Sequence, residues 1–451
     1  MIAPLLLVWL LPLPGTAQTL PALLQATLDA DPAIAGASAQ VRAAEQRVTQ
    51  ARASFGPTAA LTANSTESRY TEAPAFDLRQ FRSLQVAVQV TQPLYRGTLF
   101  PALDAAQALL SQAQAGLAQA QAESAQRLLE AVFELLKSRD ALSFSRAQQV
   151  ASAEQLAAAR RAFEVGTVAA TDLRESEARA DAVAAQVLTT ESDLALRQQV
   201  LAELAGQAAP GLMERGLDGS QLPTLAVASV LEWLADANIN NPQVAQALRA
   251  LEAAEAEVRK AWLGHAPTAD MSLSYTMSGD TGTVTSAFPR RGDTSAIAFN
   301  VNVPLFASGA TQARVREALA QRDKAQADVA SARRTVSLAV RQAFSATLSA
   351  IAQARGLTAA VRSQELAFRA NRRAYQVGTK ANFEVLESQS KLFEARRDLS
   401  RARYDAWSGY LKLKTQAGLP VNTDITALDG WMVSAPPLDL LTPVRPAAGT
   451  R

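Results

Sequence analysis

The feature that most constrains this chain is a short helical corner that occurs twice. RAFEVGTVAATDLRE begins at Arg161 and RAYQVGTKANFEVLE begins at Arg373, which is an offset of 212 in the numbering. In each, a helical pattern stops at a Val-Gly-Thr triplet, whose glycine supplies the left-handed residue that helix C-termini favour. A second helix with acidic residues in its first turns begins a few residues later. The chain is therefore a tandem duplication, and its fold must be built from two copies of one unit.

The remaining sequence follows the same duplication. Helical patterns at 19–54 and 228–262 match with an offset of 210, and each is interrupted by an Asx-Pro pair, Asp31-Pro32 in the first and Asn241-Pro242 in the second. Proline is tolerated in a first helical turn but not in a helix interior, so each pair marks a new helix. The predicted parts are a first repeat at 18–207, an inter-repeat segment at 208–227, a second repeat at 228–418 and a C-terminal tail at 419–451. The inter-repeat segment and the tail are predicted to be loops or short elements, and the tail is either equatorial or partly disordered.

The N-terminal stretch 1–17 is apolar and ends in Gly15-Thr16-Ala17, small residues of the kind that a signal peptidase reads. We predict an export signal over 1–17. The alternative is a buried N-terminal helix, which three prolines in this stretch disfavour.

Each repeat contains two segments in which apolar and polar residues alternate, a pattern that suits a strand and not a helix. A polar loop separates the two segments, so each repeat is predicted to contain one hairpin. The predicted strands are 58–70 and 83–93 in the first repeat and 268–278 and 294–304 in the second.

Long helical patterns run from each hairpin to the Val-Gly-Thr corner and back. The predicted helices are 98–165, 171–206, 310–377 and 381–418. At ~1.5 Å per residue the longer ones would each extend roughly 100 Å, which no compact globule needs. On the last helix, small and apolar residues recur with the 3,4 spacing of a coiled-coil seam: Val385, Ser388, Leu392, Ala395, Leu399, Ala402, Ala406, Gly409 and Leu413. The first copy has a similar seam, which Arg197 interrupts.

Composition excludes several classes of function. Lys and Arg total 44 and Asp and Glu total 42, so no excess of charge indicates a nucleic-acid partner. The chain has no cysteine and a single histidine, His265, which removes disulfides and thiolate metal sites and leaves little basis for histidine catalysis. No nucleophile motif, phosphate loop or metal-ligand cluster is present in the sequence, so we predict neither an enzyme nor a cofactor.

Four strands with one apolar face must cover that face. The long helices are predicted to pack against one another as coiled coils, so they are not available to cover this face. Lipid is the other environment that could cover it. Strands of about 10 residues that alternate apolar and polar side chains are typical of a transmembrane barrel. About eight strands are the fewest that close one, so the sequence predicts an oligomer that pools its strands in a membrane.

With its export signal, tandem helix-hairpin-helix repeats, Asx-Pro helix openings, Pro-Leu-aromatic corners and paired Val-Gly-Thr turns, the chain resembles the TolC family of outer-membrane efflux and secretion channels over about 19–418. The resemblance implies a mainly α fold with a small β part. Three chains would close a 12-stranded β-barrel in the outer membrane of a Gram-negative-type bacterium. Their long antiparallel coiled-coil helices would form a trimeric α-barrel in the periplasm, with the inter-repeat segment and the tail at its equator.

The same resemblance implies a passive exit duct in a tripartite efflux pump or a type I secretion system. A periplasmic adaptor and an inner-membrane transporter of the RND, ABC or MFS type would open the duct. Two alternatives stay open at this point: a periplasmic adaptor, which also combines helical hairpins with strands, and a secreted coiled-coil scaffold. The sequence does not identify the cargo.

The resemblance also assigns roles to residues at the corners. Glu384 and Glu387 match the acidic residues that ring the periplasmic aperture, where the family more usually has aspartate. Two residues of the second copy, Tyr375 and Lys380, match a latch to the first copy at Thr171 and Asp172. Lysine here replaces an arginine and lacks its bidentate fork. The helix-turn corners expected to contact the adaptor are Val165, Gly166, Thr167, Val377, Gly378 and Thr379, and the barrel-helix corners include Pro93, Gly97, Pro304 and Gly309.

The residues alone permit a simpler interpretation of the acidic pair. Carboxylates in the first turns of a helix are favoured by its dipole, and Lys380 with Glu384 could form an ordinary exposed i,i+4 pair. If Glu384 and Glu387 instead line an aperture in three chains, their crowded carboxylates are expected to favour cations and to take up some protons.

Overall fold

The structure is a computed structural model that describes residues 19–69, 80–206, 212, 215–217, 222–225, 229–282, 288–380 and 382–434. The predicted export signal lies outside these residues, as do most of the inter-repeat segment and the part of the tail that follows Ser434. None of the helices in the described ranges has the combination of length and apolar character needed to cross a membrane.

The chain forms two compact units, and each draws on both sequence repeats. We call 37–116 with 243–332 the strand unit, and 1–36 with 117–242 and 333–451 the corner unit. The repeats are thus units of sequence and not separate compact bodies.

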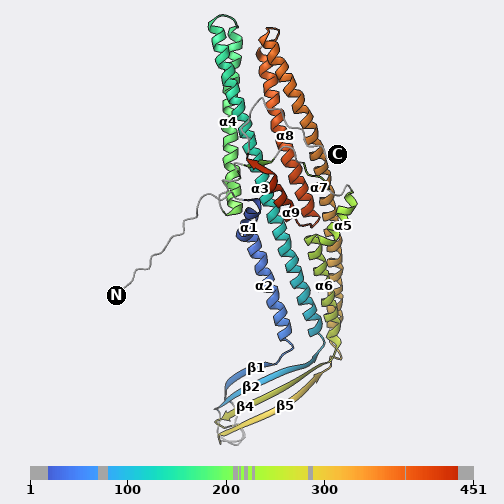
Figure 1. Cartoon of the computed structure of the whole chain (residues 1–451). Coiled ribbons are helices and arrows are strands. Elements are labelled where there is room, and N and C mark those ends of the chain that lie inside the picture. The colour runs from blue at the N-terminus through green and yellow to red at the C-terminus, as the bar shows by residue number, and fades with distance from the viewer. Residues whose placement is uncertain are drawn as a thin grey trace, which may run out of the picture. The chain divides into compact units, whose positions relative to one another are not determined.

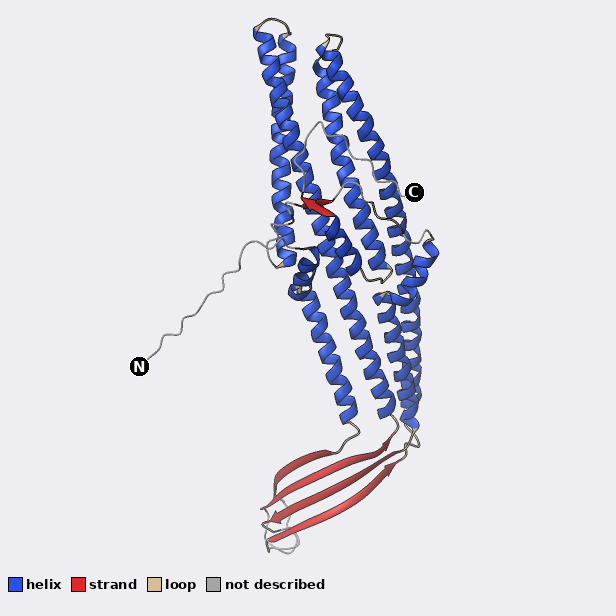
Figure 2. Cartoon of the chain, in the orientation of Figure 1, coloured by secondary structure: helices blue, strands red, loops and turns tan. Residues whose placement is uncertain are grey.

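The strand unit contains one antiparallel sheet with strand order β1-β2-β4-β5 (Figure 2). Its strands are β1 (Thr58–Arg69), β2 (Gln80–Arg96), β4 (Thr268–Asp280) and β5 (Arg290–Asn302). Both predicted hairpins are present, and the β2–β4 pairing joins the two repeats. Two strands begin earlier than predicted, because paired but charged residues such as Arg82 opposite Glu67 interrupt the alternation at their ends.

Helical segments of the strand unit lie on either side of the strands in sequence. They are most of α2 (Pro32–Ala53) and α6 (Pro242–Trp262), the short 3₁₀ helix η2 (Leu263–His265), and the first turns of α3 (Leu99–Glu164) and α7 (Ala310–Gln376).

The register places the apolar positions of all four strands on one face of the sheet. Leu61 pairs with Val88, which pairs in turn with Tyr275 on the next strand. Paired residues of antiparallel strands point to the same side. This apolar face consists of Ala59, Leu61, Ala63, Leu84, Val86, Val88, Val90, Met271, Leu273, Tyr275, Met277, Ile297, Phe299 and Val301. The opposite face carries mainly Thr, Ser, Asn and Gln, as the alternation predicts.

In its described residues, the corner unit is helical apart from one small sheet. It contains α1 (Leu20–Ala30), α4 (Ala170–Ala205), α5 (Val230–Asn240), α8 (Asn382–Gln416), α9 (Asn422–Trp431), most of α3 and α7, and the strand pair β3 (Arg215–Leu217) and β6 (Met432–Ser434). Figure 1 shows α3 antiparallel to α4 and α7 antiparallel to α8.

The core of the corner unit surrounds the middle of α3. Phe133 and Leu136 are almost fully buried there and belong to one cluster with Trp407 of α8. Ile425 and Leu428 of α9 complete it. The prediction for 419–451 was loops or short elements with disordered last residues, and it did not specify that 422–431 form a helix. The i,i+3 spacing of its two core residues was the available signal.

The predicted coiled-coil seam is confirmed in both copies. On α8, Val385, Leu392 and Leu399 are buried in one cluster with Val361 and Phe368 of α7. On α4 the buried stripe continues beyond Arg197 to the buried residues Leu201 and Ala205. The expectation that Arg197 ends the stripe is therefore wrong, because this side chain turns toward Asp193 at 3.4 Å.

Asp31 organises the junction between α1 and α2. Its carboxylate accepts hydrogen bonds from the Ala33 N–H at 2.8 Å, Ser124 Oγ at 2.5 Å and Arg127 Nη2 at 2.8 Å. The Ser124 hydrogen bond contributes most to lowering the pKa of Asp31 below its usual value. A carboxyl whose pKa is lower in the folded state stabilises the fold above its unfolded pKa, and this stabilisation is lost as the pH falls through the folded pKa.

We expect Asp31→Ala to lower the free energy of unfolding by about 1–2 kcal/mol at pH 7, because the helix loses its N-terminal cap. The difference from wild type should shrink as the pH falls below about 4, the unfolded pKa of aspartate. Urea unfolding followed by circular dichroism at pH 7 and pH 3 measures both effects. Asp29→Ala is the matched control, because Asp29 is exposed and bonds only Gln25 of its own helix among described partners. Equal losses for the two variants would contradict the role of Asp31.

Candidate functional site

Both Val-Gly-Thr corners close with the same backbone geometry. Gly166 and Gly378 have φ angles of +74° and +78°, the left-handed conformation that glycine adopts without a steric penalty. The N–H of Thr167 donates to the carbonyl of Ala162 at 2.9 Å, and that of Thr379 donates to the carbonyl of Ala374 at 3.0 Å. Each threonine hydroxyl donates to the same carbonyl as its N–H. The triplet is therefore a helix C-cap of the Schellman type in both copies.

The valine of each triplet points into solvent. Val165 is 74% exposed and Val377 is 73% exposed, although both are large apolar side chains. The cap geometry requires the glycine and uses the threonine, but it gives the valine no contact to bury it.

Both predicted aperture carboxylates have a lysine partner. Lys380 Nζ lies 2.5 Å from Glu384 Oε2 and donates to Asn371 Oδ1 at 2.9 Å. Lys391 Nζ lies 2.7 Å from Glu387 Oε1. The hydrogen bond from Lys391 lowers the pKa of Glu387. The Lys380–Glu384 contact is thus the i,i+4 pair that the sequence left open as a simpler interpretation.

The four latch residues are not brought together in this chain. Tyr375 is 40% exposed, and Thr171 and Asp172 are exposed. Within the ranges that the structure describes, no hydrogen bond or ion pair joins Tyr375 or Lys380 to the first-copy residues. The latch stays a prediction, as does the aperture.

A groove between α4 and α8 unites acidic residues of the two copies. Glu175, Arg179, Phe383 and Glu387 line it, together with three aliphatic side chains. Glu175 and Glu387 are related by the offset of 212, and so are Arg179 and Lys391. Arg179 and Lys391 are not among the predicted site residues. Their position four residues after a glutamate in both copies was the signal for them.

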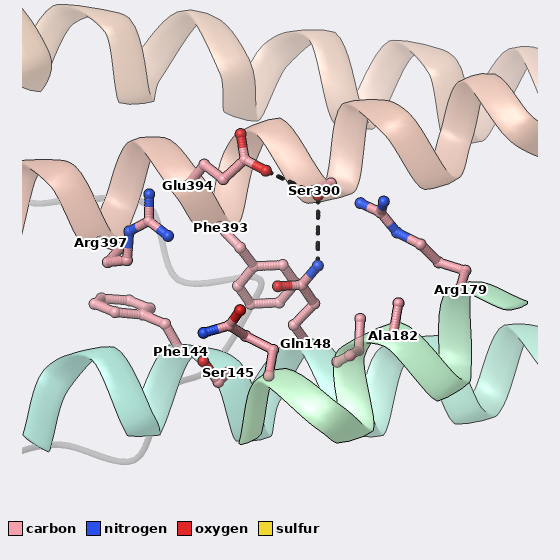
Figure 3. Close-up of a pocket in the computed structure, with 11 residues that line it drawn as sticks. Phe144, Ser145, Gln148, Arg179, Ala182, Ser390, Phe393, Glu394 and Arg397 are labelled. Carbon is pink, nitrogen blue, oxygen red and sulfur yellow. Dashed lines mark hydrogen bonds between the residues drawn. The ribbon is translucent and has the colours of Figure 1, made fainter. Parts of the chain in front are cut away.

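A second pocket shares Arg179 with this groove and lies between α3, α4 and α8 (Figure 3). Phe144 and Phe393 line it, and Gln148 Nε2 donates to Ser390 Oγ at 3.4 Å across it. Figure 3 shows the Arg179 side chain extending from α4 toward α8. Within the described ranges, no group of three or more acidic or histidine side chains is placed to hold a metal ion.

The predicted barrel-helix corners differ between the copies. In the first, β2 shifts register between Pro93 and Tyr95 and continues to Arg96, and a Cβ on Gly97 would lie only 3.3 Å from Leu263 Cδ2. In the second, β5 ends at Asn302 before Pro304, and Gly309 turns the chain into α7 with a φ of +82°. Leu305 and Phe306 between them are 91% and 87% exposed.

Comparison with known proteins gives consistent matches. The chain matches the model of the family described as outer membrane efflux protein over residues 23–207 and 233–419. Outer membrane protein TolC of Vibrio cholerae serotype O1 is 28% identical over 398 residues, which are 88% of this chain and 89% of the relative. The proteases secretion protein PrtF of Dickeya chrysanthemi is 26% identical over 70% of this chain and 68% of its own length. The crystal structure of the outer membrane protein VceC from Vibrio cholerae covers 88% of this chain and 96% of its own, with a TM-score of 0.72 at 21% identity, and has the same fold.

Proposed function

This chain belongs to the outer membrane efflux protein family and is an outer-membrane exit duct, and we propose that it works as a passive homotrimer whose helices extend into the periplasm. The family match includes both repeats, which distinguishes the chain from an adaptor with one helical hairpin and from a secreted scaffold.

The observation that carries this proposal is the apolar face of the sheet. Its outer members Ile297, Phe299 and Val301 are each 68–70% exposed. Exposed side chains of this size in one continuous patch are costly in water, whereas lipid covers them without cost. The polar opposite face suits a water-filled lumen.

The two edge strands support assembly through the sheet. Among the described residues, β1 and β5 each pair with a neighbour on one side only. An open edge leaves backbone N–H and C=O groups unpaired, and in lipid such groups have no water to bond. Pairing β5 of one copy with β1 of the next satisfies them and continues the sheet around a closed barrel.

The corners supply the contacts for partners in this proposal. Val165 and Val377 are exposed apolar side chains at the same place in both copies, where a periplasmic adaptor would bind. The adaptor would connect the duct to an inner-membrane transporter. One relative is named for the secretion of proteases, so secreted polypeptides join small molecules as possible cargo classes. The chain would catalyse no reaction, and the transporter would supply the energy.

Two adjacent residues of β4 test the orientation of the sheet in lipid. Leu273 belongs to the apolar face and Ser274 points to the opposite face. The chain contains no cysteine, so Leu273→Cys and Ser274→Cys each introduce one unique labelling site. With an environment-sensitive fluorophore on that cysteine, we expect brominated lipid to quench the label at position 273 strongly and the label at 274 weakly. A water-soluble quencher should give the opposite order.

Equal quenching at both positions, or stronger lipid quenching at 274, would contradict the lipid-facing sheet. Native mass spectrometry of the protein extracted from outer membranes tests the number of copies separately. Three chains per complex is the expected result, and a monomer would contradict the shared barrel.

A further inference from the structure

The acidic residues near the corners occur together with basic residues at a fixed spacing. Lys380 precedes Glu384 by four positions and Lys391 follows Glu387 by four, with contacts of 2.5 Å and 2.7 Å. In the first copy, Arg179 follows Glu175 at the same spacing. Side chains at this spacing are neighbours on a helix surface, about 5–6 Å apart at Cβ.

The groove between α4 and α8 contains charged residues from both copies of the repeat. Glu175 and Glu387 line it from opposite helices, and Arg179 lines it with them. Arg179 forms no hydrogen bond or ion pair with another described residue, Glu175 and Glu387 included, so it adds a positive charge to the groove without a direct contact to either carboxylate. The groove is therefore lined by one arginine as well as by the two glutamates that the duplication relates.

We propose that Lys380 and Lys391 neutralise the negative charge of Glu384 and Glu387 at the periplasmic aperture and thereby set the ion selectivity of the duct. This inference rests on the proposed function and on the assignment of Glu384 and Glu387 to the aperture. Of the corner carboxylates Asp172, Glu175, Glu384 and Glu387, only Asp172 lacks a basic residue four positions away, because Val168 occupies the corresponding place. The duct is thus not the bare ring of carboxylates that the acidic residues alone predict.

Distance decides how far the charges cancel. The paired charges are 2.5 Å and 2.7 Å apart, whereas the screening length is about 10 Å at 0.1 M salt. An ion in the aperture therefore experiences the net charge of each Lys–Glu pair, which is close to zero. Neutralisation here does not require protonation, because the hydrogen bond from Lys391 lowers the pKa of Glu387 and favours its ionised form.

Two measurements on the purified full-length protein in planar lipid bilayers follow. Under a KCl gradient, the reversal potential should indicate nearly equal permeability to K⁺ and Cl⁻. Lanthanum ions added on the corner side should block the wild-type duct only weakly. In the Lys380→Gln/Lys391→Gln double variant, the duct should become cation-selective, and lanthanum should block it at least about tenfold more tightly, because a trivalent ion then meets unpaired carboxylates at close range.

The matched control is Lys412→Gln, which removes a positive charge from the same helix α8. Lys412 lies several turns beyond Lys391 toward the end of α8 and has Glu130 as its partner at 3.8 Å. Lanthanum block and selectivity should stay at wild-type values in this variant. An equal change in the control would overturn the specific role of the corner lysines.

A further variant separates this inference from the position of the aperture. If Glu384→Gln/Glu387→Gln changes selectivity but Lys380→Gln/Lys391→Gln changes neither selectivity nor block, the aperture assignment stands and the neutralisation is overturned. If neither double variant has an effect, the aperture lies elsewhere and the inference fails with it. The quenching experiment on β4 tests the duct itself and does not depend on either result.

Discussion

Replacing Glu365 by alanine is expected to destabilise the α7–α8 helix pair by about 3–5 kcal/mol, the usual effect of leaving one buried charge without its partner. The side chains of Glu365 and Arg396 are only 9% and 8% exposed, and Arg396 Nη2 lies 2.7 Å from Glu365 Oε1. Arg396 Nε is buried and has no hydrogen-bond partner among the described residues even in the intact pair. Removing the carboxylate therefore leaves a buried guanidinium with no compensation. Thermal unfolding of the detergent-solubilised protein, followed by circular dichroism, measures the loss.

The first copy of the repeat indicates which control variants to use. With the offset of 212, the counterparts of Glu365 and Arg396 are Ala153 and Ala184, so one copy has an ion pair where the other has two alanines. The double variant Glu365→Ala/Arg396→Ala should regain a large part of the lost stability, because no uncompensated charge remains. Lys324→Ala on the same helix, which breaks an exposed i,i+4 pair with Asp328, should cost less than about 0.5 kcal/mol. If Glu365→Ala lowers the stability no more than Lys324→Ala does, the predicted cost of an unpaired buried charge is wrong.

Replacing Gly418 by alanine is expected to cost about 2–5 kcal/mol, since it combines an unfavourable backbone angle with a steric clash. Gly418 caps α8 with a φ of +72°, and a Cβ there would lie 2.4 Å from both the carbonyl carbon and oxygen of Asn240. Those atoms belong to backbone that cannot rotate away. Asn241 also donates to the carbonyl of Gln416 at 2.8 Å, so the end of α8 is bonded to the α5–α6 junction.

Gly206 provides a matched comparison, because it is the first-copy counterpart of Gly418 at the same offset of 212. Its φ is +66°, but among the described residues a Cβ there would meet only the Cβ of Ala30, at 3.3 Å. Gly206→Ala should therefore show mainly the backbone cost of about 1–2 kcal/mol. The difference between the two variants in the midpoint of thermal unfolding isolates the clash. Equal midpoints would indicate that the junction around Asn240 yields to the added methyl group.

Periodicity was sufficient to predict most of the elements. The alternation in 268–278 and the 3,4 spacing of Val385, Leu392 and Leu399 each describe one face of a regular element, and the structure has those faces. A face is a local property, because it depends only on residues a few positions apart. The segment that forms the short helix α9 was predicted only as a loop or short element, because it has just two strong core residues, Ile425 and Leu428, among many polar ones.

The candidate site could be predicted only in part. The duplication identified the corners and their acidic residues, and the family resemblance predicted an aperture there. Neither indicated which basic side chain each carboxylate contacts. Lys380 had partners available on its own chain, Asn371 and Glu384, and its contacts are with these residues and not with the predicted latch. That choice depends on side-chain rotamers and on neighbouring copies, which the spacing of residues does not specify.

The sheet also has a consequence for biogenesis. If lipid and neighbouring copies cover the sheet as proposed, a single chain in water leaves Leu305, Phe306, Ile297 and Phe299 exposed until it reaches the membrane. The unpaired edges of β1 and β5 can form hydrogen bonds with an incorrect strand as readily as with the correct one. Maturation of this protein would then require both the other copies and a bilayer. Any delay between export and assembly would be a period in which the chain is prone to aggregate.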